Sequence, residues 1–380
     1  MSQDLAPGEQ RFAVITDRAL ESLRGLIGVK ITDTVEPWCY EATRDNIRHY
    51  AHGIGDDNPL WCDPGYAAGT RYGTVIAPPS FLFALNRIYS GYVGGLPGVH
   101  AMWSGASTTW HRPLRRGDEV RTEAYLKDLV EHNTRFAGRA IQQIYHVDFF
   151  VGDELVAGGD TWCFRTERDT ARERGTKYTQ ARETEPRYSA EDLEQIWKAY
   201  QAESVRGATP RYIEDVKVGQ ALPTMTKGPM TVTGFIGYAQ GWGGLYIRAN
   251  RLAYQQLRKH SGLGIADRFG IPDVPERVHW DDELARRVGT PRAYDYGPER
   301  TSWLTHHLTD WMGDDGFLAT HEAKIRRHNP TGDTITITGK VTAVDVADRL
   351  VTVEQTATQQ DGELSALGSG TIRLPARGTA

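Results

Sequence analysis

The feature that most constrains this chain is an internal repeat. The segment 50–53 (YAHG) has a counterpart 188 residues later at 238–241 (YAQG), and the segment 63–67 (DPGYA) has one 218 residues later at 281–285 (DDELA). The change of offset marks an insertion in the second half, at about 242–277. Because self-similarity reports a structural unit that is used twice, the chain is expected to contain two copies of one fold.

Both halves end in the same strand pattern. In each half, alternating apolar and polar residues fold back at a tight turn, Gly152-Asp153 in the first half and Asp361-Gly362 in the second. Such dipeptides between alternating runs are typical of antiparallel hairpins. Helical patterns precede the strands, so each half is expected to wrap an antiparallel sheet around a central helix. The pattern predicts an α+β double hot-dog fold, in which the two sheets pair edge to edge.

A charged connection separates the halves. Residues 166–188 are rich in Arg, Glu and Thr, and Ser189 then caps a predicted helix whose apolar stripe is expected to pack against the protein. We place the first domain at 1–165, a linker containing this helix at 166–208, and the second domain at 209–380.

Composition excludes several classes of function. The 44 basic and 49 acidic side chains give a net charge of −5 with no dense basic run, so no nucleic-acid partner is expected. No window approaches the roughly 18 consecutive apolar residues of a membrane helix. The start MSQDLAPGEQ lacks the order of a signal peptide. We therefore expect a cytoplasmic protein with no membrane partner.

The cysteines and histidines indicate neither a disulfide framework nor a metal site. Cys39, Cys62 and Cys163 are an odd number without CxxC spacing, which predicts free thiols. The histidines of the second half, including His306 and His307, show no metal-binding spacing. No metal is expected.

The sharpest motif is GDDNPLW at 55–61, followed by IAPP at 76–79. Here the chain resembles the MaoC-like family of R-specific enoyl-CoA hydratases and 3-hydroxyacyl-CoA dehydratases, whose pattern Gly-Asp-x-Asn-Pro-x-His carries a catalytic Asp and His. Asp56 and Asn58 fit this pattern, but Trp61 stands in the place of the His. Indole accepts no proton at neutral pH. The resemblance therefore implies a first half that binds substrate through these three residues without catalysing.

Two later matches extend the resemblance over the first half. The segments 96–101 (LPGVHA) and 110–118 (WHRPLRRGD) are similar to the strands of the family's N-terminal dehydratase-like domain.

The second half resembles the family from 212–219 (YIEDVKVG) onward and keeps the histidine. His279 stands in the place of the catalytic His, two residues before an acid. The family Asp would fall at Val274, so Asp273, one residue away, and Glu276 are the carboxylates offered near the imidazole. Either could orient His279 or exchange protons with it.

The segment 294–297 (YDYG) stands where the family has Ala-His-Gly, whose backbone amides contact the thioester carbonyl. A backbone amide of Tyr296 or Gly297 at the start of a helix is expected to stabilise an enolate oxygen, with Tyr294 beside it at the substrate. Asp295 is a third candidate acid, and the alternative for it is a helix cap.

The resemblance implies a lyase of fatty acid or lipid metabolism that adds water to a 2-enoyl-CoA or removes it from a 3-hydroxyacyl-CoA. His279 would be the general base, and the CoA thioester is the substrate, with no further cofactor. Two alternatives are a hot-dog acyl-CoA thioesterase and a non-catalytic acyl-CoA-binding subunit. The insertion at 242–277 either covers the mouth of the acyl tunnel or elaborates the surface. The family also implies a homodimer, or a hetero-oligomer with a related hot-dog chain.

Overall fold

The computed structural model describes residues 14–31, 36–134, 138–167 and 185–378. Most of the charged connection predicted at 166–188 lies outside the described residues, as does the N-terminal MSQDLAPGEQ. None of the helices in the described parts combines the length and apolarity that crossing a bilayer requires.

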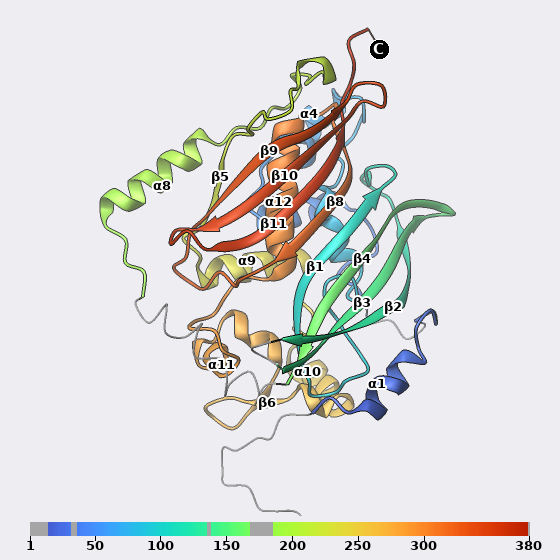
Figure 1. The fold of residues 1–380 in the computed structure, drawn as a ribbon, viewed down its shortest axis with the longest axis vertical. Helices are drawn as coiled ribbons and strands as arrows, with labels where there is room; N and C mark the ends of the chain where they lie inside the picture. The colour runs from blue at the N-terminus through green and yellow to red at the C-terminus, as the bar shows by residue number, and fades with distance from the viewer. Residues whose placement is uncertain (1–13, 32–35, 135–137, 168–184, 379–380) are drawn as a thin grey trace, which may run out of the picture.

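A curled antiparallel sheet of nine strands forms the framework of the fold, in the order β2-β3-β4-β1-β8-β11-β10-β9-β5 (Figure 1). The first half contributes four strands and the second half five, and a separate two-stranded ribbon, β6-β7, lies in the insertion. The strands are β1 (His100–Trp110), β2 (Val120–Thr134), β3 (Gly138–Val151), β4 (Glu154–Thr166), β5 (Met225–Lys227), β6 (Ile265–Ala266), β7 (Pro272–Asp273), β8 (Phe317–Ile325), β9 (Ile335–Asp345), β10 (Leu350–Gln359) and β11 (Leu364–Arg373).

The two half-sheets join where β1 pairs with β8, from Gly105 opposite Lys324 to Thr109 opposite Thr320. Outward from this junction the order repeats, as β1-β4-β3-β2 on one side and β8-β11-β10-β9 on the other. The predicted hot-dog fold with edge-to-edge pairing is therefore confirmed, as one continuous sheet. Gly105 lies at the junction because a Cβ there would come within 2.2 Å of the Trp162 ring.

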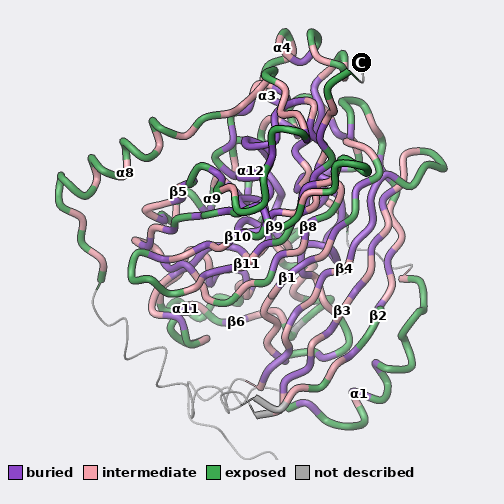
Figure 2. The backbone as a smooth tube through the Cα atoms, turned by 45° about the horizontal axis from the view of Figure 1, so that its top comes forward, coloured by how far each residue is buried: buried purple, intermediate pink, exposed green. Residues whose placement is uncertain are grey.

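The central helix of the second half is α12 (Gly297–Met312), and it is buried from Pro298 to its end. It packs against β1, β8 and β11. Figure 2 shows α12 buried along its length, inside the curve of the sheet. A helix covered on all sides is expected to be apolar, yet α12 carries several charged or titratable side chains, which must find partners inside the protein.

The central helix of the first half is much shorter. It consists of η1 (Pro79–Phe81) and α5 (Leu82–Leu85), and Asn86 leaves the helical conformation. The glycine-rich segment 91–98 (GYVGGLPG) follows, and three of its glycines have positive φ. Glycine favours such turns and disfavours helix, so the chain does not resume a helix in this segment.

The repeated segments 50–53 and 238–241 meet in space. They lie in α2 (Arg44–Gly53) and α9 (Val232–Trp242), which cross in contact. A Cβ on Gly53 would lie 3.0 Å from a carbonyl oxygen of α9, and one on Gly241 would lie 2.8 Å from a carbonyl oxygen of α2. The repeated glycine therefore permits a close helix crossing between the two halves.

Each half also repeats a pair of short helices with an aspartate between them. In the first half, α3 (Pro59–Cys62) is followed by α4 (Pro64–Ala68), and in the second, η4 (Pro275–His279) is followed by α11 (Asp282–Arg287). Asp63 and Asp281 cap the second helix of each pair through backbone N–H groups. Trp61 and His279 consequently lie at equivalent places, two residues before the cap.

The linker helix α8 (Ala190–Ala202) stands away from the body of the protein (Figure 1). Ser189 and Asp192 form the capping box at its start, as the sequence predicts. The expected packing of its apolar stripe is found only in part, because Leu193, Ile196 and Tyr200 are half-buried whereas Trp197 is 49% exposed. The end of the helix reaches the body, where the Tyr200 hydroxyl donates to the Gly228 carbonyl.

The remaining helices are short, and two of them, α10 and η3, belong to the insertion. They are α1 (Asp17–Arg24), η2 (Ile213–Asp215), α10 (Asn250–Lys259) and η3 (Ser261–Leu263). The three cysteines are free thiols, as expected.

Candidate active site

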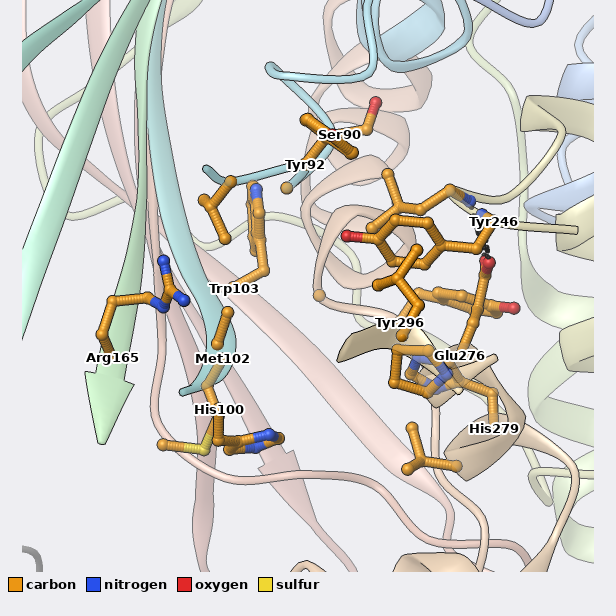
Figure 3. Close-up of a pocket in the computed structure, with 18 of the residues that line it drawn as sticks. Ser90, Tyr92, His100, Met102, Trp103, Arg165, Tyr246, Glu276, His279 and Tyr296 are labelled. Atoms are coloured by element: carbon orange, nitrogen blue, oxygen red, sulfur yellow. Dashed lines mark hydrogen bonds between the residues drawn. The ribbon is translucent and has the colours of Figure 1, made fainter. Parts of the chain in front are cut away.

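A cavity of about 770 Å³ lies between the two halves at the start of α12. Its volume is within the range of ligand-binding pockets. The first half lines it with the segment 90–103 and Arg165, and the second half with parts of the insertion and the segments 275–279 and 294–300. Figure 3 shows side chains of the first half, including Trp103, facing His279 and its neighbours across the cavity.

His279 lies in the wall of this cavity, at the end of η4. Its Nδ1–H donates to the Tyr294 carbonyl oxygen at 2.7 Å, and its ring stacks on Tyr296 with 3.7 Å between ring centroids. Because Nδ1 carries the proton, the lone pair is on Nε2. Burial lowers the pKa of His279 to about 4, so the imidazole is neutral at pH 7 and able to accept a proton. The rings of Tyr294 and Tyr296 both contact the imidazole.

One backbone amide at the start of α12, in the cavity wall, is left without an acceptor in the described part of the chain. The Tyr296 N–H donates to the Glu299 carboxylate at 3.3 Å, whereas the Gly297 N–H has no acceptor among the described residues. Of the two amides that the sequence suggested, Gly297 is the one left for a ligand, and it lies at the positive end of the helix. A Cβ on Gly297 would come within 2.5 Å of the Trp103 ring, so this close approach requires glycine.

Asp295 also lines the cavity, but its oxygens are engaged. Arg300 and Asn329 donate to both of its carboxylate oxygens, with Arg300 Nε at 2.8 Å and the Asn329 amide nitrogen at 2.8 Å. The side chain is fully buried. It does not cap the helix either, because Tyr296 is at the N-cap. This geometry makes Asp295 an anchor for the first turn of α12, in place of the acid or cap that the sequence suggested.

The two carboxylates that precede His279 differ in placement. Asp273 is 45% exposed at its side chain, contacts Arg277 at 3.6 Å and is absent from the cavity wall. Glu276 is buried in the wall, where it accepts the backbone N–H groups of Leu245 at 3.0 Å and Tyr246 at 2.8 Å. Burial raises the pKa of Glu276. The structure thus places Glu276, and not Asp273, beside the site, where it secures the start of the insertion.

Asp56, Asn58 and Trp61 lie away from this cavity. Asn58 caps α3 by accepting the Leu60 N–H at 3.0 Å, and Asp56 accepts the Asn58 N–H at 3.0 Å. Trp61 is 2% exposed and lines a separate cavity of only about 40 Å³. The sequence grouped these residues with the substrate site, but their positions separate them from His279.

A second titratable cluster surrounds Asp56. His306 and Asp310 of α12 lie against it, with His306 Nε2 3.5 Å from an Asp56 oxygen and 3.3 Å from an Asp310 oxygen. Lys227 and Glu203 complete the cluster. Burial raises the pKa of Asp310 to about 7. No sequence motif indicates this cluster, because its members come from four separate parts of the chain.

The model of the FAS1-like, dehydratase domain region matches residues 26–146. A UPF0336 protein of Streptomyces avermitilis is 33% identical over 95 residues, which are 24% of this chain and 63% of that protein. The match therefore spans less than two thirds of that relative. A UPF0336 protein of Parafrankia is 30% identical over 138 residues, 35% of this chain and 87% of that protein.

Another relative carries an activity in its name. The 3-oxo-4,17-pregnadiene-20-carboxyl-CoA hydratase alpha subunit of Mycobacterium tuberculosis is 28% identical over 127 residues, 29% of this chain and 40% of that subunit.

Solved structures agree on the fold. A MaoC-like dehydratase superposes with a TM-score of 0.66 at 20% identity, covering 93% of this chain and 100% of that chain. A MaoC domain protein of Chloroflexus aurantiacus gives 0.58 at 13% identity, covering 93% and 96%. Together with the sequence matches, this shows that the chain belongs to the MaoC-like hot-dog dehydratase family.

Proposed function

We propose that this protein is a lyase that adds water to a 2-enoyl-CoA or removes it from a 3-hydroxyacyl-CoA, with His279 as its general base. One observation carries the proposal. The neutral imidazole of His279 and the free amide of Gly297 line the same cavity at the positive end of α12. A base and an oxyanion donor beside one cavity are what conjugate addition of water to a thioester requires.

The chemistry needs only these groups. As a water oxygen bonds to C3 of the enoyl thioester, Nε2 of His279 takes a proton from it and negative charge moves to the thioester oxygen. The Gly297 N–H stabilises that oxygen, and the Tyr294 carbonyl stabilises the imidazolium through Nδ1–H. The imidazolium then returns its proton to C2, which restores the neutral His279. Dehydration is the same sequence reversed.

The remaining carboxylates hold the site in place. Asp295 fixes the first turn of α12 through Arg300, and Glu276 fixes the insertion against η4. Neither is required to move a proton, because His279 both takes and returns it. This assigns the two groups positioning roles.

The first half supplies the wall for the acyl group. Met102, Trp103 and Leu96 line the cavity from this side, and Tyr246 of the insertion faces them. The cavity owes this room to the short central helix of the first half. Similarity to a pregnadiene-carboxyl-CoA hydratase subunit supports a CoA thioester with a bulky acyl group. The insertion then shapes the acyl site, which favours the first of the two interpretations of it.

Basic groups of the insertion suit the CoA portion. Lys259 and His260, at the end of α10, also line the cavity. A cation there is placed to bind a CoA phosphate. We further propose that the chain assembles with a second copy or with a related hot-dog chain, since a relative is the alpha subunit of its enzyme.

The test follows the loss of enoyl-thioester absorbance with short, long and polycyclic 2-enoyl-CoAs, while free CoA is assayed in parallel. We expect hydration by the wild type and a rate at least about 10²-fold lower with His279→Asn, with His52→Asn as the control on an exposed histidine. Release of free CoA at the rate of absorbance loss would instead identify a thioesterase. Binding without turnover on every substrate would identify a non-catalytic subunit.

A further inference from the structure

The cluster around His306 gathers residues from both halves and from the linker. Nε2 of His306 is 3.5 Å from Asp56 Oδ1, 3.3 Å from Asp310 Oδ2 and 3.8 Å from Glu203 Oε1. On the other side of the ring, Lys227 Nζ lies 3.1 Å from Nδ1. Asp56 follows α2, Asp310 is one helical turn beyond His306, Glu203 ends α8, and Lys227 ends β5.

The charges of this cluster do not balance. Three carboxylates, those of Asp56, Asp310 and Glu203, face one ammonium group, that of Lys227. Asp56 is 1% exposed and Asp310 6% exposed. One oxygen of Asp56, both oxygens of Asp310 and one of Glu203 have no hydrogen-bond donor among the described residues. Buried carboxylates without partners are strongly disfavoured, so the cluster has to be balanced either by bound protons or by a cation.

The distances indicate what kind of positive charge fits. Protons shared within the cluster would bring donor and acceptor to about 2.7–3.2 Å. The contacts of His306 Nε2 are longer than that. Two atoms that bind one ion at about 2.0–2.2 Å lie ~3.0–3.5 Å apart, which agrees with the contacts to Asp56 and Asp310. Candidate ligand atoms of Asp56, His306 and Asp310 all lie within 4.8 Å of one another.

We propose that Asp56, His306 and Asp310 bind a first-row divalent metal ion that joins the first half to α12. One imidazole nitrogen and two carboxylate oxygens suit Zn²⁺, Mn²⁺ or Co²⁺. Glu203, with 19% of its side chain exposed, lies at the solvent side of the cluster and supplies a route of entry.

Lys227 gives the proposal a distinctive prediction about ion affinity. An ion on Nε2 places the ring proton on Nδ1, which then faces the Lys227 ammonium. Glu203 at 3.6 Å and the Gly55 carbonyl at 3.5 Å offer Lys227 other acceptors. Lys227 therefore competes with the ion, and its removal strengthens ion binding.

The site is separate from the proposed active site. His306 lies nine residues beyond Gly297 along α12, about 14 Å by the rise of an α-helix. The ion is structural in this proposal, and its binding can be measured without any activity.

The experiment uses the untagged full chain, stripped with a chelator and titrated with Zn²⁺, Mn²⁺ or Co²⁺. We expect one ion per chain by elemental analysis, a rise in melting temperature with added ion, and visible Co²⁺ bands. His306→Gln and Asp310→Asn should lose all three, and His52→Gln, on an exposed histidine, should keep them. Lys227→Gln should bind Co²⁺ about tenfold more tightly, because a nearby cation is removed.

Two results would overturn the proposal, and neither depends on the stability of the ligand variants. One is a wild-type chain that binds no ion at submillimolar concentration or shows no Co²⁺ band. The other is weaker ion binding in Lys227→Gln, which would mean that Lys227 supports the cluster as an ion pair.

Discussion

The two halves build the same framework around His279 and Trp61 but give the two positions opposite surroundings. Each residue lies in a short helix, two residues before an aspartate that caps the next helix. Beside His279 the cavity measures about 770 Å³, and beside Trp61 it measures about 40 Å³. The comparison teaches that the repeat preserves the scaffold, while one exchange of histidine for tryptophan accompanies a closed site in the first half.

Removing the base should have the largest effect. We expect His279→Asn to lower kcat for hydration roughly 10²–10⁴-fold, the usual contribution of a general base. Trp61→Phe should leave kcat within about twofold, since Trp61 is outside the cavity and the exchange removes little volume. Steady-state kinetics on the best substrate of the panel checks both. Equal losses of kcat in the two variants would contradict the functional difference proposed between the halves.

The second-largest effect is expected when Asp295, the anchor of α12, is removed, and it is a loss of stability. Asp295→Ala leaves the buried Arg300 guanidinium without its carboxylate, which costs about 3–5 kcal/mol in the free energy of unfolding. Asp273→Ala, at an exposed position, should change it by no more than about 0.5 kcal/mol. Chemical denaturation measures both. Similar values for the two aspartates would contradict the roles given to them here.

The pH dependence of stability should distinguish wild type from His279→Asn. The folded-state pKa of His279 is about 4, below the roughly 6.5 of an unfolded histidine. From pH 7 to pH 5, His279 therefore binds a proton in the unfolded state but not in the folded state, and the free energy of unfolding falls. The wild type should lose up to about 2 kcal/mol more than the variant over this range. Parallel curves, measured by denaturation at several pH values, would show that His279 has an ordinary pKa.

The smallest expected effect is a failed rescue. Trp61→His introduces the family's base into the first half, but we expect no hydration in the background of His279→Asn. The cavity at that position is small, and Asp56 already contacts His306. Product formation above the level of His279→Asn alone, by the same absorbance assay, would show that the first half retains a usable site.

Much of the framework was predictable because its signals are local. Hairpin turns such as Gly152-Asp153 and the capping box at Ser189 depend on a few neighbouring residues, and the structure has both. The short central helix of the first half was not predicted, although the glycines of 91–98 carried the signal. The apolar stripe of α8 was predicted to pack against the protein, but none of its residues is fully buried. An apolar periodicity does not say whether a partner surface is present.

The site was predictable only in part. The neighbourhood of His279, Tyr294 and Tyr296 follows from a motif, and the structure brings them together. The roles of Asp273, Glu276 and Asp295 could not be separated, because each role depends on which distant groups approach the carboxylate. Arg300 and Asn329 reach Asp295, and backbone amides of the insertion reach Glu276.

Periodicity and turn residues were enough to predict a doubled hot-dog, and the resemblance of short motifs to the MaoC-like family located one histidine in the family's place. These signals depend on neighbouring residues, so they can be read along the chain. Only the tertiary structure decided where the cavity lies, which carboxylates are saturated, and that Asp56 meets His306 across the two halves. Such pairings join residues up to 250 positions apart, and burial sets their chemistry, so no local pattern reports them.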